Sequence, residues 1–333
     1  MENILVTGVH GFLASRLVEK ILADYRNVNI FGITRHTPSY KRSYLLQEMM
    51  DSDVNFIQGD ICNYSLMNNV VTEYEIDTII HLASNAIVRS CEQDPLGTMM
   101  NNVYGTAVFA ELARQHKKIK HLICMASDKS YGVSEKLPYV EDETPLKGKS
   151  VYEASKTLAD MWSQMYQSNF GVPITVIRSA NLFGPGDSNH SRLIPQACTS
   201  ISNNKNPWLW DGVAEYIREF VYVDDAVDFI LNLIKKGEEN SKIIPQCYNL
   251  GTGNTFMIKE LVQKLINVTK KNLKIDIKVK DMEFKEIPKQ YLSLEKSKRM
   301  LNWEAKYTGE LFDKALLETY EYYDYINMNY KTE

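Results

Sequence analysis

Two short segments of the chain hold five residues whose side chains can move protons. Tyr152 and Lys156 are four residues apart, which places them one turn apart on the same face of a helix. A lysine cation beside a tyrosine lowers the pKa of the phenol, so this pair predicts a phenolate base near neutral pH. Upstream, Ser127, Asp128 and Lys129 add a hydroxyl, a carboxylate and an amine. The five residues form a set suited to proton transfer, although Tyr-x-x-x-Lys alone also occurs on ordinary surface helices.

Hydrophobic patterning predicts the elements that must position these residues. The apolar run 122–126 predicts a buried strand, so residues 127–129 would follow at the carboxyl edge of a sheet. Similar runs alternate with segments readable as helices, at 4–6, 28–33, 54–57, 78–82 and 174–177. This alternation predicts an α/β protein with a Rossmann-type doubly wound parallel sheet, which binds ligands beyond the carboxyl ends of its strands.

The pattern changes after residue 178. Segment 181–187 is turn-rich and 203–212 is loop-like, whereas strands near 219–223 and 248–250 are predicted to return to the sheet. Helices near 258–268 and 308–323 close the chain. We therefore expect a dinucleotide-binding domain over 1–179, rejoined by about 219–252. A smaller C-terminal α/β lobe over 180–218 and 253–333 would bind the substrate.

Glycines join the first strand to the first helix in a pattern typical of dinucleotide binding. Gly8 allows a tight turn, and Gly11 lets a pyrophosphate approach the amino end of the helix, where free N–H groups favour anions. Ala14 stands in the third glycine position. Glycines also serve plain turns, but a place directly after a strand and before an amphipathic helix favours the dinucleotide site.

Two further positions bear on the cofactor. Asp60 follows the third strand, where it could accept a hydrogen bond from an adenine amino group or cap the next helix. Arg35 follows the second strand, where a protein that binds NAD would place an acidic residue for the ribose hydroxyls. An arginine there suits a 2′-phosphate, so we predict NADP, with NAD and a plain surface arginine as alternatives.

Composition excludes several classes of protein. The 333 residues are 44% hydrophobic and 24% charged, which is typical of a globular protein rather than a disordered or fibrous one. With 38 basic and 42 acidic residues the chain has no basic excess, so nucleic acid is not an expected partner. The five scattered cysteines suggest a reducing compartment and no metal site. No segment has the length and hydrophobicity of a membrane span and no leader pattern opens the chain, so we expect a cytoplasmic protein without membrane partners.

Several motifs in order carry a resemblance over nearly the whole chain: Gly8-x-x-Gly11-x-x-Ala14, Gly59-Asp60, His81-Leu82-Ala83, Asn102-Val-Tyr-Gly105-Thr106, Ser127 with Tyr152 and Lys156, Asn181-x-x-Gly184-Pro185-Gly186, and Arg218-Glu-Phe-Val-Tyr-Val-Asp224-Asp225. The sequence resembles the extended short-chain dehydrogenase/reductases, the NAD(P)-dependent nucleotide-sugar epimerase/dehydratase family. Within that family, Asp128-Lys129, Arg192-Leu-Ile-Pro195 and Gln290-Tyr-Leu-Ser293 resemble the CDP-glucose 4,6-dehydratase branch. Gly32-Ile-Thr-Arg35 is instead similar to the GDP-mannose 4,6-dehydratases.

The resemblance implies a 4,6-dehydratase that converts a nucleotide-diphosphate hexose to its 4-keto-6-deoxy form. Tyr152, assisted by Ser127, would remove the proton of the C4 hydroxyl, and Lys156 would bind the nicotinamide ribose. A neutral Lys129 would take the C5 proton while Asp128 protonates the departing C6 hydroxyl, unless Lys129 is only a salt-bridge partner. A 4-epimerase and, less strongly, a non-catalytic NADP-binding regulator are the alternatives.

The same resemblance implies binding residues and a partner. The implied cofactor contacts are Gly8, His10, Gly11, Phe12, Leu13, Thr34, Arg35, Asp60, Ile61, Leu82, Ala83, Asn102, Tyr152 and Lys156. The implied substrate contacts are Ser84, Asn181, Arg192, Leu193, Trp210 and Arg218. Asn181, Arg192 and Arg218 would hold the diphosphate, whereas Trp208 or Trp210 would stack on the base or simply pack in the core. A homodimer would form through the helices around 102–116 and 152–170.

Overall fold

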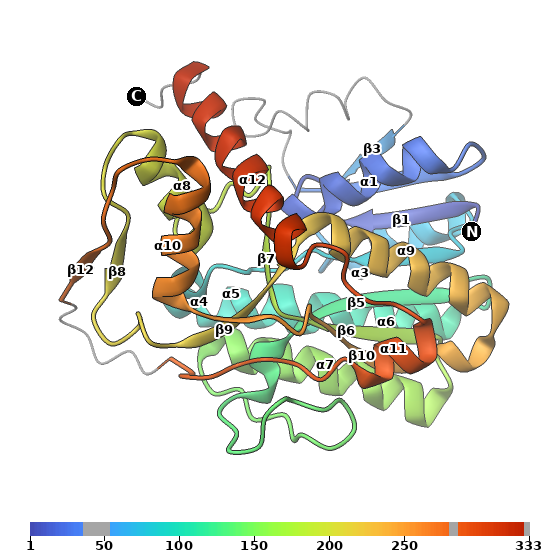
Figure 1. Cartoon of the computed structure of the whole chain (residues 1–333). Helices are drawn as coiled ribbons and strands as arrows, with labels where there is room; N and C mark the ends of the chain where they lie inside the picture. Colours follow the sequence, from blue (N-terminus) through green and yellow to red (C-terminus); the bar gives the residue numbers. More distant parts are fainter. Residues whose placement is uncertain (36–53, 280–285, 330–333) are drawn as a thin grey trace.

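The computed structural model describes residues 1–35, 54–279 and 286–329. Within these ranges its main feature is a parallel sheet of seven strands in the order β10-β6-β5-β4-β1-β2-β3 (Figure 1). The strands are β1 (Asn3–Thr7), β2 (Asn29–Thr34), β3 (Val54–Gln58), β4 (Thr78–His81), β5 (His121–Ser127), β6 (Ile174–Ser179) and β10 (Gln246–Leu250). The doubly wound sheet predicted from the apolar runs is confirmed.

Apolar side chains cover both faces of this sheet, which explains why its strands read as continuous apolar runs. Ile4 and Ile80 are wholly buried in one core, and Leu5 and Ile79 are wholly buried in the other. Helices on the first face are α1 (Phe12–Asp24) and α9 (Val223–Glu239), which pack together. Helices on the second face are α3 (Tyr64–Glu73), α6 (Gly105–Gln115) and α7 (Val151–Phe170). No helix in the described ranges has the length and mean hydropathy of a membrane span.

The strand order creates a crevice at one edge of the sheet. From β1 the chain adds β2 and β3 on one side, and then crosses to add β4, β5 and β6 on the other. The carboxyl ends of β1 and β4 therefore flank a topological switch point, where doubly wound proteins bind ligands. Short elements follow β4 and β5 at this edge: α4 (Val88–Gln93), α5 (Pro95–Met99), the π-helix η2 (Met100–Tyr104) and the 3-10 turn η3 (Asp128–Tyr131).

A smaller lobe lies on the side of the molecule opposite the chain's first residue (Figure 1). It contains a three-stranded sheet in the order β11-β9-β7 and a parallel pair of β12 with β8. Helices α8, α10 and α12 pack against one another beside them. The elements of the lobe are β7 (Asn181–Phe183), α8 (Leu193–Ser202), β8 (Trp208–Trp210), β9 (Ile217–Tyr222), β11 (Thr255–Met257), α10 (Ile258–Thr269), β12 (Asp276–Lys278) and α12 (Gly309–Asn329). Two short elements of the same stretch, η4 (Ser241–Ile243) and α11 (Glu295–Leu301), pack on the main domain instead.

Two elements lie in a different place from the one expected. The strand expected at 219–223 was to return to the main sheet, but β9 pairs with β7 and β11 in the lobe, and only β10 rejoins beside β6. Strand β9 is buried from its second residue onward, so its sequence has the pattern of any central strand and does not indicate which sheet it enters. Helix α11, expected in the lobe, packs on β10 and α9.

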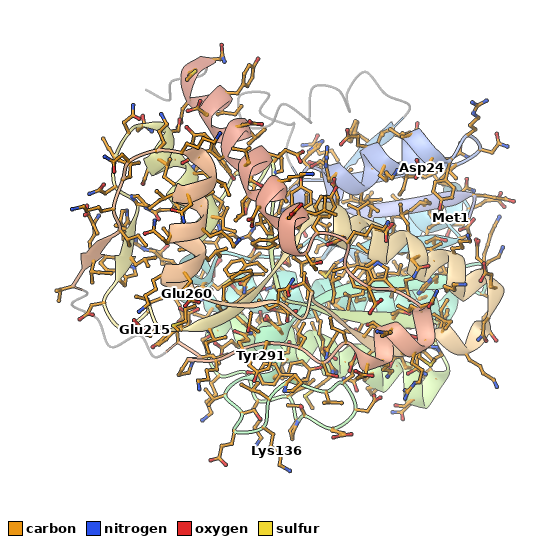
Figure 2. The ribbon with its side chains drawn as sticks, in the orientation of Figure 1. Met1, Asp24, Lys136, Glu215, Glu260 and Tyr291 are labelled. Atoms are coloured by element: carbon orange, nitrogen blue, oxygen red, sulfur yellow. The ribbon has the colours of Figure 1, made fainter. Side chains whose placement is uncertain are left out.

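The segment 286–294 runs between the lobe and the main sheet. The Gln290 amide donates to the Ile217 carbonyl at 3.1 Å, and the Ser293 amide donates to the Tyr139 carbonyl at 2.8 Å. Figure 2 shows Tyr291 on this segment, between the lobe side chains Glu215 and Glu260 and the loop that carries Lys136. These backbone hydrogen bonds bring residues from the end of the chain to the crevice.

Candidate active site

The carboxyl ends of β1 and β4 are tied together by a buried polar network. The Thr7 hydroxyl lies 2.9 Å from Nδ1 of His81 and accepts hydrogen bonds from the amides of Leu82 and Ala83 at 3.1 and 3.0 Å. The other ring nitrogen of His81 lies 3.2 Å from the Thr106 hydroxyl. Burial lowers the pKa of His81 to about 3, so the ring is neutral and serves as a structural tie between strands and helix.

The glycine-rich turn lies against this loop. Gly8 has a φ of +65°, and a Cβ at that position would lie 2.9 Å from the Ala83 Cα, so only glycine fits the turn. The Gly11 amide donates to the Gly8 carbonyl at 2.7 Å, and helix α1 starts at Phe12 without a side-chain cap. The first amides of α1, including those of Phe12 and Leu13, therefore form an amino end that favours an anionic group.

The ends of β2 and β3 provide the residues expected at an adenosine. Nδ1 of His10 lies 3.1 Å from the Thr34 hydroxyl, and Arg35 follows as an exposed residue. Asp60 accepts a hydrogen bond from the Cys62 amide at 2.8 Å, whereas Asn63 supplies the cap of α3. Asp60 is therefore not the helix cap that the sequence left open. The side chain of the next residue, Ile61, is buried in the core.

Helix α7 brings Tyr152 and Lys156 to the end of β5. The helix begins with a capping box in which the Ser150 and Glu153 side chains each bond to the other's backbone amide. Tyr152 lies beside Ser127, the last residue of β5, and the Lys156 amine donates to the Met125 carbonyl at 2.9 Å. The tyrosine and the lysine thus contact the same strand from one face of one helix.

The electrostatics of this pair differ from the sequence-based expectation. Burial raises the pKa of Tyr152 to about 12, although the nearby Ser127 hydroxyl and Arg192 act in the opposite direction. Burial lowers the pKa of Lys156 to about 8. In the protein chain alone, desolvation of the phenolate outweighs the favourable contacts, so the net shift of the tyrosine pKa is opposite to the one expected from the sequence.

Asp128 is a buried carboxyl with one satisfied oxygen. Its side chain is 2% exposed, Oδ1 accepts from the Ser127 hydroxyl at 3.1 Å, and Oδ2 has no hydrogen-bond partner among the described residues. Burial raises its pKa to about 6, against the opposing influence of Lys129. A carboxyl in this state can exchange a proton near neutral pH.

Lys129 forms an ion pair with a residue that the sequence did not single out. Its amine donates to Oε1 of Glu286 at 2.9 Å, and the Glu286 carboxylate also lies 3.4 Å from the Arg218 guanidinium. Burial acts to raise the pKa of Glu286, but Lys129 and Arg218 hold it below its usual value. The salt-bridge alternative considered for Lys129 is thus present in the structure.

The residues expected to hold the diphosphate and the residues expected to stack on the base have different surroundings. Arg218 is buried and donates to the carbonyls of Ile217, Pro288 and Ile287, which engages its guanidinium inside the protein. Arg192, just before Leu193 at the start of α8, is more exposed and pairs with Asp187 at 2.9 Å. Asn181 donates to the Glu219 carbonyl at 3.1 Å. Trp208 and Trp210 lie on β8 with ring centroids 4.8 Å apart, and Lys278 lies over the Trp208 ring.

Comparisons with known proteins identify the family. A family model described as GDP-mannose 4,6 dehydratase matches residues 5–314, nearly the whole chain. The chain belongs to this family. A dTDP-D-glucose 4,6-dehydratase from Bos taurus is 27% identical over 271 residues, which cover 81% of this chain and 73% of the relative.

Solved structures that resemble this chain support the family assignment. The dTDP-glucose 4,6-dehydratase from Bacillus anthracis in complex with NAD is 27% identical, with a TM-score of 0.86 and 99% of both chains covered. A UDP-glucose 4-epimerase from Thermotoga maritima has the same fold, with a TM-score of 0.83 at 23% identity over 96% of this chain and 98% of the epimerase. The predicted membership of the extended short-chain dehydrogenase/reductases that modify nucleotide sugars is confirmed.

In this GDP-mannose 4,6 dehydratase family member, many of the sequence-predicted residues meet at the crevice. Ala83, Ser84, Asn102 and Lys156 line one cavity there. Asn102 also fixes the wall of that cavity, because its amide group donates to the Ser155 hydroxyl at 2.9 Å and to the Asn85 carbonyl at 3.0 Å. Trp208 and Trp210 lie apart from this group, on the strand pair β8–β12 of the lobe.

Sequence reasoning missed the residues that orient the site from a distance. His81 stood in a quoted motif, but its position between two threonine hydroxyls needed the fold to be seen. Asp187 adjoins the quoted glycine motif and turns out to hold Arg192. Glu286 carried no signal, since a glutamate in a segment of mixed charge is typical of a solvated surface.

Proposed function

We propose that the protein is a nucleotide-sugar 4,6-dehydratase, which converts a nucleotide-diphosphate hexose to a 4-keto-6-deoxyhexose. The observation that carries this proposal is that two proton-transfer groups adjoin each other at the end of β5. Ser127 with Tyr152 suits oxidation at C4, and Asp128 with Lys129 adds the acid and base that loss of water requires. A 4-epimerase needs only the first of these groups.

Tyr152 and Ser127 would carry out the first step. The ionised Tyr152 oxygen takes the proton of the sugar C4 hydroxyl, and Ser127 supports it by a hydrogen bond. Because burial holds the pKa of Tyr152 at about 12, the phenolate needs an added positive charge nearby. A bound oxidised nicotinamide dinucleotide would supply that charge, together with the hydride-transfer chemistry that the cycle requires. Lys156, with a pKa of about 8, is mostly protonated at neutral pH and would hold the nicotinamide ribose.

The residues around the glycine-rich turn fit a dinucleotide. Gly8 leaves no room for a side chain against Ala83, which lets the backbone approach a pyrophosphate at the amino end of α1. We propose that the dinucleotide contacts the cofactor-binding residues that the family resemblance implies. Among them, Leu82 and Ala83 are held in place by hydrogen bonds from their amides to the Thr7 hydroxyl. NADP is the proposed cofactor because Arg35 is exposed directly after β2. NAD is the alternative, and the similar Bacillus anthracis dehydratase was solved with NAD.

The substrate would be a nucleotide-diphosphate sugar held between the sheet and the lobe. Arg192 is the guanidinium best placed for the diphosphate, because it lies near Tyr152 and, within the described part of the chain, pairs only with Asp187. Arg218 would contribute only if its contacts with segment 286–288 opened. Ser84 would contact the sugar from the cavity beside Lys156, and Asn181, Leu193 and Trp210 complete the proposed contacts.

A 4-epimerase of the same family is the second candidate. The observation that favours it is the ion pair of Lys129 with Glu286, which engages the amine that a dehydratase would use as a neutral base. A regulator that binds NADP without chemistry is a third interpretation. The presence of Ser127, Tyr152 and Lys156 together argues against a regulator, because a sensor has no need of proton transfer.

We also propose a cytoplasmic homodimer. Each subunit would have a dinucleotide-binding domain over 1–179, rejoined by about 219–252, and a substrate lobe over 180–218 and 253–333, except that β9 lies with the lobe and α11 with the main sheet. Large apolar side chains are exposed on α5, η2 and α7, including Leu96, Tyr104, Met161 and Trp162. A second copy would cover them with its own equivalent face. The five cysteines are free thiols, which supports a reducing compartment.

Product analysis tests the proposed function. The purified protein is incubated with CDP-, GDP-, UDP- and dTDP-hexoses and NADP or NAD, and the products are weighed by mass spectrometry in heavy water. A dehydratase gives a product lighter than its substrate by one water, after correction for deuterium gained at C5. In single turnover, Asp128→Asn and Lys129→Met should accumulate reduced cofactor, because elimination slows by about 10²–10⁴-fold for each group removed. Sugar isomers with no water lost, at full rate in both variants, would leave the epimerase.

A further inference from the structure

Tyr323 connects the last helix of the lobe, α12, to the loop that carries Arg192. Its phenol donates a hydrogen bond to the Asp187 carbonyl at 2.5 Å. Tyr323 is 2% exposed, and its ring packs edge-on against His190, with 5.8 Å between the ring centroids. Burial, together with the nearby Asp187, raises the pKa of this phenol above its usual value, so the hydroxyl keeps its proton and donates it.

Asp187 links the contact with Tyr323 to the side chain of Arg192. Asp187 is buried, and its Oδ1 accepts a hydrogen bond from the Asn189 amide at 3.0 Å. Its Oδ2 accepts from the Arg192 guanidinium at 2.9 Å, and the Arg192 amide donates to the Asn189 carbonyl at 3.0 Å. Tyr323 thus fixes the backbone of Asp187, while the carboxylate of Asp187 fixes the guanidinium.

Arg192 is the member of this series that reaches solvent. Its side chain is 37% exposed, and among the described residues it forms an ion pair with Asp187 alone, through one nitrogen. A guanidinium has five N–H donors, so others remain for an anionic ligand. An unrestrained arginine loses rotamer freedom when it binds, so a guanidinium that is already held in one orientation binds an anion more tightly.

We propose that Tyr323 is a positioning residue, which holds the Asp187 loop so that Arg192 meets the diphosphate of the nucleotide sugar in one orientation. This inference rests on the proposed function, in which Arg192 binds that diphosphate. Tyr323 acts through Asp187 and does not itself touch the substrate. Because the phenol is uncharged, its contribution is to orientation alone, whereas the carboxylate of Asp187 also offsets part of the positive charge of Arg192.

Binding of nucleoside diphosphates tests this role without any turnover. CDP, GDP, UDP and dTDP are titrated by calorimetry into the full chain with NADP or NAD bound, and the one that binds most tightly is used for every variant. Tyr323→Phe keeps the ring and every charge, and should weaken binding by about two- to ten-fold, the range for one hydrogen bond. Tyr320→Phe is the matched control, because the Tyr320 hydroxyl donates to Asp324 within the same helix and should leave the affinity unchanged. A wild-type affinity in Tyr323→Phe would overturn the proposal.

A double-mutant cycle separates positioning from a general loss of structure. If Tyr323 acts through Arg192, Tyr323→Phe causes no further loss of affinity once Arg192→Ala is present. The same fold-loss in both backgrounds would show a merely structural tyrosine and overturn the proposal. So would a wild-type affinity in Arg192→Ala, or a failure of all four diphosphates to bind, because no contact would remain for Tyr323 to position. If product analysis finds no loss of water from any hexose, the dehydratase function fails, whereas the binding cycle still decides the role of Tyr323.

Discussion

Above about pH 6, the protein should be less stable with the carboxylate of Asp128 than with an uncharged side chain at the same position. Its side chain is 2% exposed, and its pKa rises from 3.8 to about 6 on folding. The folded state therefore binds more protons than the unfolded state between these values, and stability falls as pH rises through them. A shift of about two pH units corresponds to about 3 kcal/mol of unfolding free energy. Asp128→Asn, which never ionises, should avoid that loss.

Urea unfolding of the wild type and Asp128→Asn across about pH 4 to about pH 8 measures this effect. Near pH 4 the two proteins should be nearly equal, and the variant should gain stability up to about pH 6 and keep a constant lead beyond it. Its elimination activity should nevertheless be lost. Asp77→Asn is the matched control. Burial acts to raise the pKa of Asp77, but the hydrogen bonds it accepts from the Thr78 hydroxyl and two backbone amides lower that pKa overall.

The stability difference between Asp77→Asn and the wild type should have the opposite sign at high pH. The stabilising effect of Asp77 is present above its unfolded pKa and is lost as pH falls, so Asp77→Asn should be less stable than the wild type at high pH. A stability difference for Asp128→Asn that does not change with pH would refute the reasoning, since it would show that the carboxyl titrates alike in the folded and unfolded chain.

Four further outcomes are expected. In binding titrations, Arg35→Ala should weaken the affinity for NADP by about ten- to hundred-fold and the affinity for NAD much less. An equal loss for both dinucleotides would show that Arg35 does not contact the 2′-phosphate. Tyr152→Phe should slow reduction of the cofactor by at least about 10²-fold in stopped-flow absorbance, and a normal rate would assign the base elsewhere. Asp160→Asn should cost about 3–5 kcal/mol in urea unfolding, because Arg178 would stay buried and unpaired, and a loss under about 1 kcal/mol would contradict this. Sedimentation should show a dimer that Met161→Lys dissociates, and a monomeric wild type would exclude it.

Most of the fold and the chemistry of the site could be predicted from local sequence. Strands buried on both faces give apolar runs, so the parallel sheet was legible before any contact was known. The glycine turn depends on backbone freedom at Gly8, which is a property of the residue itself. The four-residue spacing of Tyr152 and Lys156 places both on one helix face in any context. These features arise within one or two elements, so the sequence by itself determined them.

Tertiary structure alone decided the charges and partners of the same residues. Glu286 lies 157 positions after Lys129, and no local pattern indicates that they meet. Strand β9 entered the lobe sheet because its partners β7 and β11 lie there, although its apolar pattern fits either sheet. The pKa of Tyr152 rises because distant segments exclude water from it, and desolvation outweighs its neighbours. Burial and pairing depend on which parts of the chain are brought together, and that information exists only once the chain has folded.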